Sequence, residues 1–260
     1  MYFYIYDSFL TDRKYERVLA AVETRLTDLG IAGKIGRLTP FTNARGLVRD
    51  ETRRGVRTIV VVGNDETVSQ VVGGLGEADV ILGLIPVGAP CHIARSLGIP
   101  EGADACDVLS RRVIQQVDLG KINGQHFLWQ VVIPPGRYTV EGEGNYRISS
   151  VGEDSEIIVS NLRGAEMQVR GPAALRRPGD PQDGFLDMLI APKRTGGVLG
   201  GRGKESETGL IPLRRLKVKS EEPFAVVVDG RRTEYREALI EIAPGRLKVI
   251  TGKERVFADA

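Results

Sequence analysis

Two short apolar runs, each followed by a polar turn that contains glycine, stand out in the first hundred residues. The run 58–62 is Thr-Ile-Val-Val-Val, and the run 80–85 is Val-Ile-Leu-Gly-Leu-Ile. Continuous apolar runs of this length, rich in β-branched residues, are typical of strands buried on both faces of a parallel sheet. A helix pattern follows each turn, so both turns are predicted at the carboxyl edge of the sheet, where open α/β folds bind ligands.

Strand and helix patterns alternate as far as residue 110. The first seven residues predict a strand, and apolar residues then recur at helical spacing from Tyr15 to Leu29. A second strand is predicted at 31–38, and helices are predicted at 43–54, 68–75 and 93–97. Such alternation predicts an N-terminal α/β domain with a parallel sheet over residues 1–110.

Helical patterns nearly vanish after residue 110, and short strands separated by Gly and Pro turns take their place. Asn123-Gly124 is a strong hairpin signal. This pattern predicts an antiparallel β-sandwich domain over residues 111–260. Its expected strands are 113–119, 125–133, 138–141, 146–151, 156–160, 186–190, 213–219, 224–228, 238–242 and 247–251.

Composition narrows the function classes. The 260 residues are 42% hydrophobic and 27% charged, as in an ordinary soluble globular protein. A net charge of +2 is too small to argue for a nucleic acid partner. Two cysteines make no disulfide framework and fit a reducing compartment. The N-terminus lacks the features of a signal peptide and no run approaches 18 apolar residues, so we expect a cytoplasmic protein.

Several polar residues allow both a chemical and a structural interpretation. A glycine turn that opens a helix is a ready phosphate site, and the alternative is that Asp65 and Thr67 simply cap the helix that follows. Asp183 and Asp187 could be turn and strand-end residues, and Asp229-Gly230 a plain hairpin turn. The adjacent Cys91 and His92 suggest a thiol–base pair or a metal site. Neighbouring residues on a helix do not face each other, so we interpret this pair as structural.

Several of these segments, taken in order, resemble motifs of the diacylglycerol kinase catalytic-domain family, the bacterial soluble lipid kinases with sphingosine kinase relatives. The family's G-G-D-G-T aligns with residues 63–67, and its I-P-x-G-T-x-N-D-F-A-R-x-L-G with residues 85–98. The stretch Ala94–Pro100 is a close match. Residues 118–124 resemble its first hairpin, 183–187 its D-G-x-L-D, and Val228-Asp229-Gly230 its D-G-E.

The resemblance implies a nucleotide-binding α/β domain and a β-sandwich, with the active site in the cleft between them. It implies transfer of the ATP γ-phosphoryl group to the hydroxyl of a diacylglycerol-like lipid, with Mg²⁺. The implied catalytic residues are Asp65 and Asp229, the latter as general base. The implied cofactor-binding residues are Asp7, Ser8, Gly63, Asn64, Asp65, Thr67 and Gly88. The implied metal position is formed by Asp183, Leu186 and Asp187.

Partners are expected to be a nucleotide and a lipid or other small alcohol. A set of basic residues suggests possible contact with a membrane surface. A homodimer is a separate possibility. Each charge in that set could contribute about 1 kcal/mol against anionic lipid, although a solvated face is the alternative. The set is Arg202, Lys204, Arg214, Arg215, Lys217 and Lys219.

The departures from the family motifs leave three hypotheses. Residues 7–11 replace the family's N-P-x-S-G loop, Pro90-Cys91-His92 replace its x-N-D, and Glu66 and Arg231 stand where it has glycine and an acid. These changes favour a degenerate protein that binds nucleotide or lipid without transfer over an active lipid kinase. A relative of the NAD kinases is the third hypothesis, because they share G-G-D-G-T, but residues 94–100 and 183–187 favour the lipid kinases.

Overall fold

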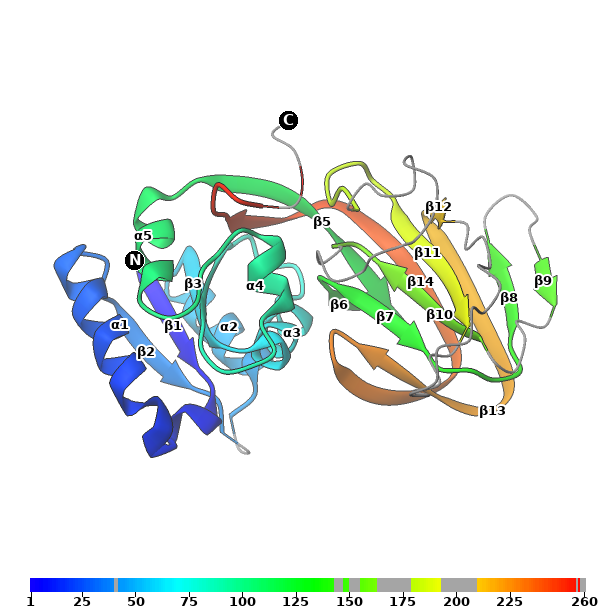
Figure 1. Cartoon of the computed structure of the whole chain (residues 1–260), viewed down its shortest axis with the longest axis horizontal. Helices are drawn as coiled ribbons and strands as arrows, with labels where there is room; N and C mark the ends of the chain where they lie inside the picture. The colour runs from blue at the N-terminus through cyan, green and yellow to red at the C-terminus, as the bar shows by residue number, and fades with distance from the viewer. Residues whose placement is uncertain are drawn as a thin grey trace, which may run out of the picture.

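The computed structural model describes residues 1–39, 42–142, 147–149, 155–162, 179–192, 210–255 and 257. The chain forms an α/β unit and a β unit that lie side by side, as Figure 1 shows. Two strands, β5 (Ile114–Ile122) and β14 (Arg231–Ile250), run between the units and join them. Over the described ranges no helix is both long and apolar enough to cross a bilayer.

The α/β unit is built on the parallel strands that the apolar runs predict. Strands β1 (Tyr2–Tyr6), β2 (Lys34–Arg37), β3 (Thr58–Gly63) and β4 (Ile81–Pro86) lie in the order β2-β1-β3-β4. Every residue of β3 is buried, as expected for a central parallel strand. Its helices are η1 (Ser8–Thr11), η2 (Arg13–Tyr15), α1 (Glu16–Asp28), α2 (Ala44–Arg53), α3 (Asp65–Gly74), α4 (His92–Ser96) and α5 (Asp104–Arg111).

The β unit is antiparallel in its described strands. Two pairs of predicted strands are single long strands in the structure, because 213–219 joins 224–228 and 238–242 joins 247–251. The strand predicted at 125–133 is instead divided by a turn at Leu128-Trp129. The strands are β6 (Gln125–Phe127), β7 (Gln130–Ile133), β8 (Thr139–Gly142), β9 (Arg147–Ser149), β10 (Ser155–Ser160), β11 (Leu186–Pro192), β12 (Leu210–Leu213) and β13 (Arg215–Val228).

Strand β14 belongs to both units. Its first part pairs with β13, and its last residues pair in parallel with β4, where Val249 lies opposite Leu82. A bulge between Ala243 and Leu247 separates the two parts. Leu247, Val249 and Ile250 therefore pack in the hydrophobic core of the α/β unit, although the sequence assigned them to the second domain. The predicted fold class is confirmed, while the division at residue 110 stays a prediction.

Helix α5 was not predicted. It has only eight residues, and its apolar positions Ala105, Val108 and Leu109 are too few to establish a helical period. It packs against β4, where the Cβ of any residue larger than glycine at position 83 would meet Leu109. It also contacts α1 through an ion pair between Arg25 and Asp107.

Candidate functional site

The polar loops after β3 and β4 lie against each other at the carboxyl edge of the sheet. Val87 N–H donates to the Gly63 carbonyl at 3.0 Å, and Asp65 N–H donates to the Pro90 carbonyl at 2.9 Å. The Asn64 side-chain amide donates to the Ala89 carbonyl at 3.3 Å. Both loops are predicted at the carboxyl edge of the sheet, and direct hydrogen bonds join them there.

The loop after β1 completes this edge through Asp7 and Thr67. The Thr67 hydroxyl donates to Asp7 Oδ2 at 2.8 Å, and Asp7 Oδ1 accepts from Phe9 N–H at the start of η1. Ser8 is exposed and its hydroxyl lies 3.2 Å from Asp7 Oδ1. Asn64 and Thr67 form a reciprocal capping box at the start of α3. The residues predicted to bind nucleotide thus lie together, and the capping interpretation of Thr67 also holds.

Two of the first backbone amides of α3 already have partners within the protein. Asp65 N–H donates to Pro90, and Thr67 N–H donates to the Asn64 side chain. A helix start binds phosphate through unoccupied amides. A triphosphate at this helix would have to displace these contacts or use other donors. This helix start therefore fits phosphate binding less well than an open glycine loop would.

Gly88 is a position where the loop needs glycine. Its φ is +83°, and an added Cβ would come within 2.9 Å of the Phe9 ring and 3.3 Å of the Tyr15 hydroxyl. L-residues rarely adopt this backbone conformation. Gly88 therefore lets the loop after β4 approach the aromatic side chains that follow β1.

The carboxylate of Asp65 joins the starts of α3 and α4. Its side chain is 3% exposed, and its oxygens accept from the backbone N–H groups of His92 at 2.7 Å and Ile93 at 3.0 Å. His92 Nδ1 lies 3.0 Å from Asp65 Oδ2. The His92 ring stacks on Trp129, with ring centroids 4.8 Å apart and an interplanar angle of 14°. This stack connects the α/β unit to the β6–β7 turn of the β unit.

Asp229 holds that same turn from the other side. It is 0% exposed, and its carboxylate accepts the backbone N–H groups of Leu128, Trp129 and Gln130 at 2.8–2.9 Å. Burial raises the pKa of Asp229 to about 6, the three N–H donors limit the rise, and the negative charge of Asp65 adds to it. Gly230 and Arg231 beside it are exposed. The carboxylate predicted to act as general base is therefore fully engaged with backbone.

The residues predicted to hold a metal lie at the start of β11 and in the turn before it. Asp183 is exposed in a turn and accepts Phe185 N–H at 2.9 Å, while Asp187 lies in β11 opposite Pro212. Partial burial of its carboxyl group raises the pKa of Asp183, and the negative charges of Asp180 and Asp118 add to the rise. Within the described ranges, no three His, Cys, Asp or Glu side chains gather as a metal site would require. The metal position at Asp183, Leu186 and Asp187 stays a prediction.

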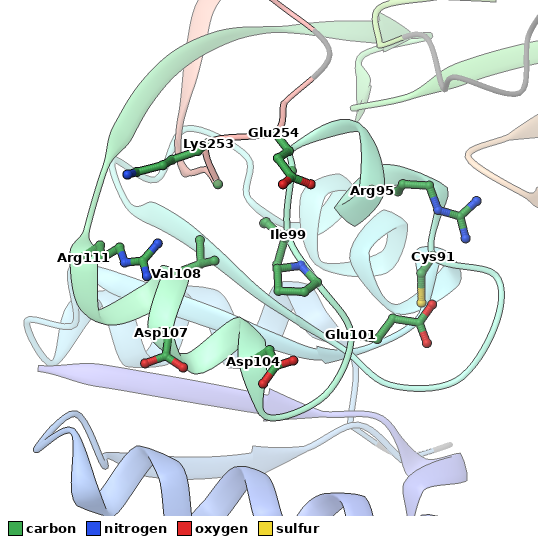
Figure 2. A pocket seen from close by; sticks show the side chains of 13 residues that line it. Cys91, Arg95, Ile99, Glu101, Asp104, Asp107, Val108, Arg111, Lys253 and Glu254 are labelled. Carbon is green, nitrogen blue, oxygen red and sulfur yellow. The ribbon is translucent and has the colours of Figure 1, made fainter.

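A cavity of about 640 Å³ lies beside α4 rather than over the predicted loops. It is lined from α4, α5 and the residues after β14, and Figure 2 shows Glu101, Asp104 and Glu254 at its wall with Lys253 and Arg111. None of the residues predicted to bind nucleotide lines this cavity, and its four carboxylates outnumber its three cationic side chains, which disfavours a triphosphate. We therefore place the candidate site at the hydrogen-bonded loops and not in this cavity.

The contacts of His92 with Asp65 and Trp129 were not predicted from the sequence. Its carboxylate partner lies 27 residues earlier, and its ring partner Trp129 lies in the other unit, so no local spacing joins the three. The available signal was the replacement of an acidic motif residue by histidine directly after the glycine loop. Asp118 was likewise named only as part of a motif. Its buried carboxylate accepts Gly184 N–H at 2.8 Å and Gly245 N–H at 2.6 Å.

Comparison with known proteins matches the chain to one family model and to several named relatives. Residues 2–122 match the family model described as the diacylglycerol kinase catalytic domain. A Pseudomonas aeruginosa protein named "Probable lipid kinase YegS-like" is 26% identical over 244 residues, which cover 80% of each chain. A Bacillus subtilis diacylglycerol kinase is 31% identical over 118 residues, which cover 44% of this chain and 39% of the relative.

The fold is shared with solved structures. A diacylglycerol kinase from Bacillus anthracis superposes with a TM-score of 0.74 at 21% identity, over 98% of this chain and 97% of the other. At that identity the likeness establishes the fold.

Proposed function

This chain belongs to the diacylglycerol kinase catalytic-domain family, and we propose that it transfers the γ-phosphoryl group of ATP–Mg²⁺ to the hydroxyl of a diacylglycerol-like lipid. One observation carries the proposal. The loops after β1, β3 and β4 join in one hydrogen-bonded network at the sheet edge, and the stack of His92 on Trp129 joins that network to the β unit. Relatives named as lipid kinases support the choice of a lipid acceptor.

Phosphoryl transfer depends on positioning and charge neutralisation more than on covalent chemistry. In the proposed complex, backbone groups at Gly63 and Gly88 and the polar side chains of Ser8, Asn64 and Thr67 surround the phosphates. Asp7 orients Thr67 through their 2.8 Å hydrogen bond. Asp65 lies at the reacting centre, where it fixes the start of α4.

A second candidate function is nucleotide or lipid binding without transfer. It is favoured by the occupied amides of α3 and by Glu66, which is exposed in the first turn of that helix. A carboxylate about 4 Å from a phosphate charge costs about 1 kcal/mol in water and roughly 4 kcal/mol at an intermediate dielectric. Both features predict weak affinity for ATP.

Membrane contact through the basic set remains a proposal of narrower scope. In the described structure Arg215, Lys217 and Lys219 pair with Glu241, Glu237 and Glu141. Arg214 lies over the ring of Phe185, which is 37% exposed. Arg202 and Lys204 lie outside the described residues. The pair Phe185 and Arg214 is therefore the better candidate for contact with anionic lipid.

The deciding experiment incubates the purified chain with radiolabelled ATP–Mg²⁺ and either diacylglycerol in mixed micelles or NAD. Labelled lipid that depends on both substrates is the expected result. Binding of ATP by calorimetry without labelled product would support the binding protein instead. Labelled NAD would overturn the choice of acceptor.

The predicted metal position has a separate test. Carboxylates suit a hard cation, so Mg²⁺ or Ca²⁺ bound at Asp183 and Asp187 should raise the melting temperature. The Asp183→Asn variant should lose this response. Equal melting curves with and without millimolar cation would contradict the assignment.

A further inference from the structure

His92 has the surroundings of a residue that accepts a proton. Its ring lies between a buried carboxylate, Asp65, and the face of Trp129, and its side chain remains 29% exposed. Asp65 is 3% exposed and holds the backbone of His92 as well as its ring. Asp65 thus holds both the backbone and the ring of His92, and Trp129 supports the face of that ring.

The contact with Asp65 also determines which nitrogen is basic. An ionised carboxylate only accepts hydrogen bonds, so Nδ1 of a neutral His92 carries its proton toward Asp65 and Nε2 is the basic atom. A buried carboxylate in this position orients the ring and stabilises the imidazolium that forms after proton transfer. Adjacent Cys91 does not share this role, because burial raises the pKa of its thiol to about 12 and its Sγ–H donates to the Gly88 carbonyl.

Asp229 lies nearby, but its chemistry differs. Each oxygen accepts backbone N–H groups of the β6–β7 turn, and none of its surface is exposed. Its contacts fix the backbone of Trp129, and Trp129 in turn supports the ring of His92. Asp229 therefore acts on the site through the turn that it holds.

Polar atoms of the same turn are left for a ligand or water to satisfy. Within the described part of the chain, Trp129 Nε1 and Gln130 Oε1 are buried and have no hydrogen-bond partner. Buried donors and acceptors nearly always find a partner, which can be ordered water. Trp129 Nε1 belongs to the ring that stacks on His92, so it is a donor for a polar ligand group at this stack.

We propose that His92 is the general base that takes the proton of the acceptor hydroxyl, with Asp65 and Trp129 as positioning residues. The inference rests on the proposed phosphoryl transfer. The hydroxyl O–H bond breaks and its proton passes to Nε2 of His92, while the hydroxyl oxygen bonds to the γ-phosphorus. The bond from that phosphorus to the bridging oxygen breaks, and its electron pair leaves with ADP. The imidazolium later returns the proton to solvent.

The test is chemical rescue. The His92→Ala variant keeps the backbone N–H that Asp65 accepts, so the start of α4 is preserved. General-base catalysis contributes about 10²–10⁴-fold, so kcat should fall by roughly 100-fold or more while ATP binding by calorimetry is unchanged. Added imidazole should restore turnover, and substituted imidazoles should do so in the order of their basicity. A purely structural role of His92 would give no such order.

Two further variants test whether the rescue by imidazole is specific to the His92 position. His126→Gln removes the other histidine of the chain, which is 4% exposed in β6, and its turnover should not respond to imidazole. In the double variant His92→Ala with Asp65→Asn, rescue should weaken, because the added imidazole lacks its carboxylate partner. Should His92→Ala be poorly folded, His92→Gln replaces it, and its melting curve checks the fold.

The outcomes separate this inference from the proposed function. If the unmodified chain phosphorylates lipid and His92→Ala does so equally well, or is impaired but not rescued by imidazole, the assignment of His92 is overturned and the kinase proposal stands. If the unmodified chain binds ATP but transfers phosphate to neither lipid nor water, both are overturned.

Discussion

The junction around Asp65 and the turn around Asp229 each contain a buried carboxylate that accepts backbone N–H groups, and the two regions differ in one contact. Each carboxylate is buried, at 2% and 0% exposure, and each accepts backbone N–H groups from a segment distant in sequence. Asp65 also contacts the ring of His92, whereas the hydrogen bonds of Asp229 run to backbone alone. A backbone amide does not exchange its proton during catalysis, and an imidazole does.

This difference distinguishes a structural role of a buried carboxylate from a role in proton transfer. At the Asp229 turn, a buried carboxylate fixes the geometry of a loop, as a cap does for a helix. At the Asp65 junction, the same kind of contact also places a titratable ring between the two units. Family motifs mark both carboxylates equally, so only their partners in the structure show which region can take part in proton transfer.

The largest expected effect is the loss of stability in Asp229→Ala. Three backbone N–H groups would lose their acceptor, one of them buried and two partly buried, and each unsatisfied buried group costs about 1–3 kcal/mol, so the loss should be about 3 kcal/mol. Urea unfolding measures it. The exposed Glu222→Ala should change stability by less than about 0.5 kcal/mol. If Asp229→Ala resembled that control, the scaffold role of the turn would be wrong.

Gly88→Ala disturbs the loop next to the Asp65 junction. Strain at φ +83° and contact with Phe9 should together reduce stability by about 2–4 kcal/mol. Gly124→Ala is the matched control, because its φ is +82° and no heavy atom lies within 4 Å of the added Cβ. The control should lose only about 1–2 kcal/mol from backbone strain. Equal losses in the two variants would show that the approach to Phe9 is unimportant.

Titration should distinguish Asp229 from an ordinary surface acid. Its pKa of about 6 in the folded protein exceeds the unfolded value of about 3.9, so between these pH values the folded state binds more protons. Stability should therefore fall by about 2–3 kcal/mol as pH rises through this window. Asp229→Asn should lose this decline in unfolding experiments across pH. Parallel curves for the two proteins would contradict the burial argument.

The strands of the α/β unit could be predicted from sequence because parallel strands buried on both faces leave a continuous apolar signal. The sheet edge followed from the same signal, since the loops after β3 and β4 must meet where parallel strands end. The full extent of the long strand β14 could not be predicted from the sequence. Its bulge at Gly245 breaks the alternation, and its last residues pair with β4, a contact that no local pattern encodes.

The candidate site was only partly predictable for the same physical reason. Motif positions placed Gly63, Asp65 and Gly88 in adjacent loops, because each follows a strand. The pairing of Asp65 with His92 and the stack on Trp129 depend on how α4 and the β6–β7 turn approach each other in space. Such contacts between distant segments have no periodicity in the sequence.

The smallest expected effect concerns Glu66, which carries a second negative charge beside Asp65. Glu66 is exposed at the second position of α3, where an acid stabilises the helix by about 0.3–1 kcal/mol. Glu66→Gln should therefore lower stability slightly and yet tighten ATP–Mg²⁺ binding by up to about fivefold, or about 1 kcal/mol.

These opposite signs separate repulsion of the phosphates from a general loosening of the loop, which would weaken stability and binding together. Calorimetry at low and high salt measures the gain, which should shrink as salt screens the charge. Glu77→Gln, beyond the other end of α3, should leave ATP affinity unchanged. Unchanged affinity in Glu66→Gln would mean that the triphosphate does not approach this helix, and that the Asp65 junction binds its substrate from another side.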